Sequence, residues 1–155
     1  MLRWLALIVA LAMPAGALAS SPPVSTFKTL DGQQIRLSEL RGKIVLINFW
    51  ATSCGICRQE MPKLIRTYRQ YRSRGFEVIA VAMHYDRPVD IRAYIHKQGL
   101  PFPVVHDSDG QLARKFDQVA ATPTTFVIDG SGKLASKTLG IIDFGKLRAY
   151  LAANR

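Results

Sequence analysis

The only two cysteines of this 155-residue chain, Cys54 and Cys57, lie between an unbroken apolar segment and an amphipathic one. Residues 44–47 (IVLI) carry only aliphatic side chains, which is typical of a central parallel strand covered on both faces. After the cysteines, apolar side chains recur at spacings of three and four, which predicts a helix that ends near Gly75. These side chains are Met61, Leu64, Ile65, Tyr68 and Tyr71. A second buried strand is predicted over residues 76–82, so the order strand, helix, strand forms a βαβ unit.

The spacing of the two cysteines favours redox chemistry over a structural role. A disulfide stabilises most by closing a long loop, and a bridge across two residues closes almost none. Structural zinc sites use further Cys or His pairs, and the sequence has no second C-x-x-C or H-x-x-x-H. At the start of a helix, free amides and the helix dipole stabilise a thiolate, which is the attacking form. We therefore predict that Cys54 attacks and that Cys57, one turn further in, resolves the mixed disulfide.

The first nineteen residues have the layout of a secretory signal peptide. Arg3 precedes an apolar core over residues 4–13, a Pro-Ala-Gly break follows, and residues 17–19 (ALA) form an A-x-A cleavage pattern. The core is shorter than the ~17 residues that a spanning helix needs, although an uncleaved anchor is the alternative. We expect a periplasmic domain over residues 20–155, in a compartment where a thiol pair can persist as a disulfide.

The remaining sequence predicts short elements on both sides of the βαβ unit. The Asp31-Gly32 turn between residues 27–30 and 35–37 indicates an N-terminal β-hairpin, followed by a helical turn at residues 38–40. Helices are expected over residues 89–98 and 111–116 and after a cap at Asp143, and strands over residues 104–105, 124–128 and 133–139.

Residues 49–57 (FWATSCGIC) resemble the active-site segment of thioredoxin-fold proteins, most closely the exported TlpA/ResA-like branch. Further stretches carry the same resemblance: residues 40–50 (LRGKIVLINFW), 57–62 (CRQEMP), 122–129 (TPTTFVID) and 129–133 (DGSGK). It covers about residues 22–154 and implies an α/β thioredoxin fold. That fold has a central mixed sheet flanked by helices, with an N-terminal β-hairpin and a helix-strand insertion near residues 84–107.

The resemblance also implies roles for residues outside the cysteine pair. It predicts a cis peptide bond before Pro123, in a loop that faces Cys54 and offers the backbone of Thr122 to an extended substrate. Trp50 is assigned to the same substrate-binding site, where it is expected to pack beside the cysteines rather than to do chemistry.

The resemblance makes Glu60 the candidate proton carrier for Cys57, and its place three residues further along the helix returns it to nearly the same face. Thioredoxins themselves usually place a buried aspartate where this chain has Asn48, which cannot titrate. The alternative for Glu60 is an ordinary first-turn glutamate favoured by the helix dipole.

The net charge of +10, or +9 without residues 1–19 and their Arg3, is concentrated on the predicted helix near residues 58–74. Aromatic and basic residues do not alternate as in nucleic-acid binders, so no nucleic acid is expected. A solvated helix face explains the charge, and attraction to acidic partners or an anionic membrane is the functional alternative. The three histidines share no ligand spacing, and His84 is the best candidate for a copper ligand.

These observations predict an exported, monomeric thiol-disulfide oxidoreductase that needs no cofactor beyond its cysteine pair. The resemblance favours reduction of a disulfide in an exported partner, such as apocytochrome c or a copper-delivery protein, with electrons from a membrane thiol-disulfide donor. A disulfide oxidase or isomerase that donates disulfides to folding proteins is one alternative. A non-enzymatic Cu(I) carrier that uses Cys54, Cys57 and His84 is another.

Overall fold

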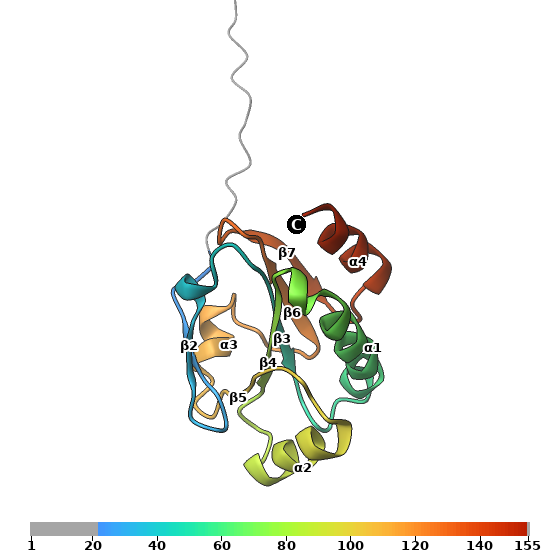
Figure 1. The fold of residues 1–155 in the computed structure, drawn as a ribbon. Helices are drawn as coiled ribbons and strands as arrows, with labels where there is room; N and C mark the ends of the chain where they lie inside the picture. The colour runs from blue at the N-terminus through green and yellow to red at the C-terminus, as the bar shows by residue number, and fades with distance from the viewer. Residues whose placement is uncertain (1–21, 155) are drawn as a thin grey trace, which may run out of the picture.

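The computed structural model describes residues 22–154, which form a five-stranded mixed sheet with helices on both faces (Figure 1). The strands are β3 (Ile44–Trp50), β4 (Phe76–Ala82), β5 (Val104–His106), β6 (Thr124–Ile128) and β7 (Leu134–Leu139), in the order β5-β4-β3-β6-β7. The strands β3, β4 and β5 run parallel, whereas β6 is antiparallel to both β3 and β7. This arrangement confirms the predicted thioredoxin fold and puts β3, which leads to the cysteines, at the centre.

The two faces of the sheet carry separate hydrophobic cores. On one face α1 (Gly55–Tyr71) and α4 (Phe144–Ala153) lie side by side. The short turn η2 (Arg72–Arg74) continues α1. Ile91 from α2 (Pro88–Gln98) joins the same core. The other face is covered by α3 (Gln111–Lys115), the turn η1 (Leu37–Leu40) and the hairpin of β1 (Thr26–Lys28) and β2 (Gln34–Arg36). Side chains of β3 alternate between these cores, as a strand buried on both faces requires.

Local sequence signals set the ends of the main elements as predicted. The helix α1 starts at Gly55, between the two cysteines. Its η2 extension ends at Gly75, which adopts the left-handed conformation with φ of 82°. Asp143 caps α4 by accepting a hydrogen bond from Lys146 N at 3.0 Å. The predicted N-terminal β-hairpin is present, and α2 with β5 forms the predicted helix-strand insertion.

The predicted signal peptide, residues 1–19, lies outside the described residues. Within residues 22–154, no helix combines the length and apolar character that crossing a bilayer requires.

Candidate active site

The two cysteines sit where the βαβ unit predicted them, at the carboxyl edge of the sheet. Cys54 is the N-cap of α1 and Cys57 lies within its first turn. A disulfide joins them, with the two Cα atoms 5.3 Å apart. Cys57 is fully buried, whereas Cys54 is partly exposed. This difference supports the predicted roles, because a partner can reach only the Cys54 sulfur.

The Cys54 sulfur faces one hydrogen-bond donor and one carbonyl oxygen. The backbone N–H of Cys57 donates to Cys54 Sγ at 3.1 Å, as expected at a helix N-terminus. The carbonyl oxygen of Thr122 lies 3.6 Å from the same sulfur. The Thr122–Pro123 bond is cis, as predicted. The Thr122 contact places the loop before β6 next to the cysteines. Thr122 is partly exposed and Pro123 is buried.

Glu60 lies on the same buried side of α1 as Cys57 and is only 2% exposed. Its Oε1 accepts a hydrogen bond from Asn48 Nδ2, and its Oε2 accepts one from the backbone N–H of Ile142, both at 3.1 Å. Burial raises the pKa of the Glu60 carboxyl above its ordinary value, although these two hydrogen bonds partly oppose the shift. The alternative of a first-turn glutamate is wrong, since Glu60 lies beyond the first turn and points into the core.

Asn48 connects the helix that carries Glu60 to the strand after the cis-proline. It stands directly opposite Thr125 in the antiparallel β3–β6 pair, and its Nδ2 also donates to Thr125 Oγ1 at 3.0 Å. Asn48 and Thr125 are 0% and 2% exposed. Sequence reasoning identified Asn48 as unable to titrate but missed its contacts with Glu60 and Thr125. The available signal was a lone amide within an otherwise apolar strand.

Asp86 is a second residue of the site that sequence reasoning missed. It is 6% exposed and lies just beyond β4, at the sheet edge that carries the cysteines. Its Oδ2 accepts a hydrogen bond from Thr52 N at 2.7 Å, and its Oδ1 accepts one from Thr52 Oγ1 at 2.9 Å. Asp86 therefore fixes the short segment that leads from β3 to Cys54. An acidic residue a few positions after a buried strand was the available signal.

Trp50 lies in the same hydrophobic core as Cys57, which corrects its predicted role in substrate binding. Its side chain is fully buried and packs against Tyr94 of α2, with ring centroids 5.0 Å apart. A fully buried indole offers no surface to a substrate in this disulfide-bonded state. Trp50 instead joins the insertion helix to the strand that ends at the active site.

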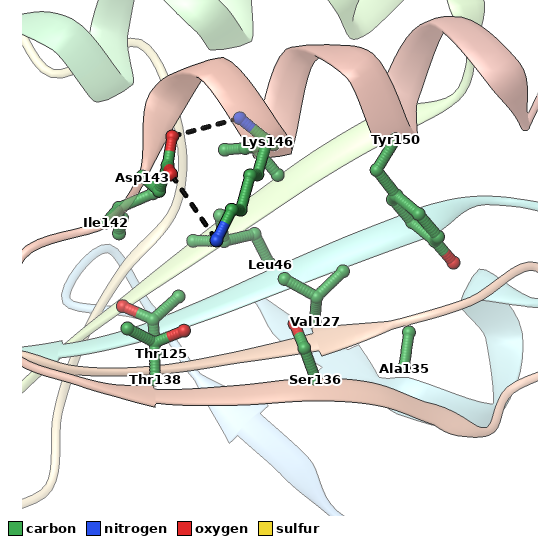
Figure 2. A pocket seen from close by; sticks show the side chains of 11 residues that line it. Leu46, Thr125, Val127, Ala135, Ser136, Thr138, Ile142, Asp143, Lys146 and Tyr150 are labelled. Carbon is green, nitrogen blue, oxygen red and sulfur yellow. Dashed lines mark hydrogen bonds and ion pairs between the residues drawn. The ribbon is translucent and has the colours of Figure 1, made fainter.

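A cavity of about 280 Å³ lies between α4 and the β6–β7 hairpin (Figure 2). Thr125 and Ile142 stand in its wall and also make the contacts to Asn48 and Glu60 described above. At its rim Lys146 approaches Asp143 (Figure 2). Neither cysteine lines this cavity.

The described residues contain no group of three or more His, Cys, Asp or Glu side chains placed to hold a metal ion. His84 lies beside Gly110 and Arg114 in a separate cavity of about 350 Å³, and its ring packs edge-on against Tyr85. His96 is exposed on α2, and His106 ends β5. The structure thus gives no contact that joins a histidine to the cysteine pair among residues 22–154.

Comparison with known proteins agrees with this geometry. The AhpC/TSA family matches residues 20–137. The thiol-disulfide oxidoreductase ResA of Bacillus subtilis is 33% identical over 132 residues, which are 85% of this chain and 73% of that protein. ResA of Geobacillus kaustophilus is 36% identical over 88% of this chain and 78% of its own length. The crystal structure of a thioredoxin-family thiol:disulfide interchange protein from Chlorobium tepidum aligns with a TM-score of 0.81 and 28% identity, over 90% of this chain and 99% of that one. The chain is a thiol-disulfide oxidoreductase with a Cys54–Cys57 redox pair, and it belongs to the AhpC/TSA family, close to its ResA proteins.

Proposed function

We propose that the protein is exported and works as a reductase of disulfides in other exported proteins. The Cys54 thiolate attacks a partner disulfide, which forms a mixed disulfide and releases one partner thiolate. The Cys57 thiolate then attacks Cys54 Sγ, which releases the second partner thiolate and leaves the Cys54–Cys57 disulfide. Two electrons have passed to the partner, and a membrane dithiol protein returns the pair to its reduced form.

The surroundings of the Cys54 sulfur carry this proposal. The hydrogen bonds of the described residues give Cys54 Sγ one amide donor, from Cys57, and no cationic donor. The Thr122 carbonyl oxygen, which carries a partial negative charge, lies 3.6 Å from the sulfur. A strong oxidant owes its potential to a stabilised reduced thiolate. A Cys54 thiolate with one donor and a facing carbonyl oxygen is stabilised less than the thiolate of a strong oxidant. This difference favours a reducing potential for the pair.

Glu60 supports the second step of the reaction. Cys57 must lose a proton before it attacks, and its sulfur is closed off from water because the residue is fully buried. Glu60 follows Cys57 by three positions on the buried side of α1. Its raised pKa makes the carboxylate a stronger base than an exposed glutamate, so it suits transfer of that proton.

The surface near Cys54 suits an extended, apolar partner segment. Most of the large apolar side chains that the described residues expose belong to segments near the carboxyl ends of β3 and β4 and the cis-proline loop. They are Ile56, Tyr85, Val89, Leu139 and Ile141. Gly140 donates its N–H to Pro123 O at 2.8 Å, which joins Leu139 and Ile141 to that loop. A cysteine flanked by apolar residues fits here, and apocytochrome c and copper-delivery proteins are the candidate partner classes.

The reduction potential of the Cys54–Cys57 pair tests the direction of electron flow. The full chain is equilibrated with glutathione buffers, and Cys57→Ser, which cannot form the disulfide, is the control. We expect a reduction potential of about −270 mV, the value of the reducing thioredoxins. A value of about −120 mV, as in strong disulfide oxidases, would overturn the reductase assignment and favour a disulfide donor.

A further inference from the structure

The solvent-facing side of α1 and the following η2 turn carries positive charge only. Six basic residues on these elements are exposed: Arg58, Lys63, Arg66, Arg69, Arg72 and Arg74. The single acidic residue within residues 55–74 is Glu60, which points into the core. We call these six residues the α1 basic face.

None of the six takes part in the ion pairs or side-chain hydrogen bonds found among residues 22–154; the five ion pairs all lie on other elements. Two of the guanidinium groups instead stack on aromatic rings of the same elements, Arg72 over Tyr68 at 5.8 Å and Arg74 over Tyr71 at 5.6 Å. The charges of the α1 basic face are therefore not neutralised by neighbours, and their potentials add over the helix surface.

The chemistry of this face favours an anionic membrane over an acidic protein. Protein interfaces depend on buried apolar or aromatic anchors at their centres. Of the large apolar side chains exposed in the described chain, only Ile56 belongs to α1, and it lies beside the cysteines. A charged bilayer needs no such anchor, because each Lys or Arg near the surface contributes separately. Arginine, five of the six residues, also pairs bidentately with phosphate.

We propose that the α1 basic face docks the domain on anionic phospholipid headgroups. This inference does not depend on the direction of electron flow. Because Cys54 is the N-cap of α1, a helix that rests on the bilayer with this face keeps the redox pair at the membrane surface. The face extends along the 17 residues of α1, about 25 Å of helix, which is enough to contact several headgroups at once.

Vesicle sedimentation tests the proposal on the full chain. Partitioning is measured with vesicles of pure phosphatidylcholine and with vesicles that contain about 30% phosphatidylglycerol, and the ratio of the two isolates the anionic contribution from that of residues 1–21. The test variant is Lys63→Gln/Arg66→Gln/Arg69→Gln, which leaves both stacked arginines in place. The matched control is Lys28→Gln/Lys97→Gln/Lys115→Gln, which removes the same charge from exposed sites on other elements.

We expect the test variant to lose the preference for anionic vesicles by roughly 100-fold, with a loss of threefold or less in the control. The preference should also fall as NaCl is raised. Equal losses in the two variants would overturn the proposal, because net charge alone would then explain binding. The absence of any preference for anionic vesicles would also overturn it. In that case, binding of a glutamate-rich peptide by the wild type but not by the test variant would assign the face to an acidic protein. Unchanged circular dichroism confirms that the variants are folded.

Discussion

Asn48 and Glu60 share a hydrogen bond of 3.1 Å in the protein interior, although they belong to a strand and to the helix that follows it. The bond places a neutral amide against a carboxyl whose pKa burial raises. An amide that donates favours the charged form of the carboxyl, so it limits that shift. Asn48, which cannot itself titrate, thus opposes part of the pKa shift that burial of Glu60 produces.

The raised pKa of Glu60 makes the stability of the protein depend on pH. Because the folded-state pKa lies above the unfolded value of about 4.5, the contribution is fully present below that pH and is lost as pH rises through the folded pKa. In Glu60→Gln the side chain is neutral at every pH. We therefore expect the free energy of unfolding of the wild type to fall relative to that of Glu60→Gln as the pH rises above about 4.5. Urea unfolding at several pH values measures this difference. The exposed Glu39→Gln should track the wild type, and a Glu60→Gln curve parallel to it would contradict the pKa shift.

Removal of the Asn48 amide should destabilise the protein most at neutral pH. In Asn48→Leu the volume is nearly kept, but ionised Glu60 loses a donor and its pKa rises further. We expect a cost of about 1–3 kcal/mol at pH 7 and a smaller cost near pH 4.5, where the carboxyl is more nearly neutral. Unfolding free energies at the two pH values give the result. In the Glu60→Gln background the cost should no longer depend on pH, and a pH dependence that survives there would place the effect elsewhere.

Glu60→Gln should also slow catalysis at the resolving step. Without a base, the Cys57 thiol is deprotonated slowly, and a general base contributes about 10²-fold or more to such a step. We expect the first attack by Cys54 to remain fast while the mixed disulfide accumulates. Stopped-flow reduction of a disulfide peptide, with acid quenching and mass spectrometry, separates the two steps. If both steps slowed equally, Glu60 would act on the whole site rather than on Cys57.

Substitution of each cysteine should separate the attacking from the resolving sulfur. Cys54 is partly exposed and Cys57 fully buried. We expect Cys57→Ser to trap a stable mixed disulfide with partner proteins and Cys54→Ser to trap none. Non-reducing gel electrophoresis of the two variants, exposed to the same periplasmic extract, makes the comparison. Trapping by Cys54→Ser alone would reverse the assigned roles.

Loss of the Asp86 carboxylate should loosen the segment before Cys54. In Asp86→Ala the Thr52 amide and hydroxyl lose their acceptors, which costs about 1–3 kcal/mol when such groups stay buried. Thr52→Val removes only the hydroxyl bond and should cost less. A double-mutant cycle between the two positions measures the coupling energy from unfolding curves. Strict additivity would show that the hydroxyl bond contributes no stability, which would leave the bond from the Thr52 amide as the link to Asp86.

The sequence by itself determined the elements that local patterns encode. The apolar run before the cysteines, the spacing of the α1 core residues, Gly75 after η2 and the cap at Asp143 each act on a few neighbouring residues. The cis bond before Pro123 followed from the family resemblance, because base rates for proline favour trans.

Only the tertiary structure decided which polar groups meet in the interior. Glu60 contacts the backbone of Ile142, 82 positions away, and Asn48 contacts Thr125 at a separation of 77. Thr52 and Asp86 are 34 positions apart. Periodicity predicts that a side chain faces inward but not what it meets there, since that depends on strand order and register. The same limit explains the error at Trp50: an aromatic residue beside the active-site cysteines could face substrate or core, and the packing of Tyr94 from the insertion helix closes it off.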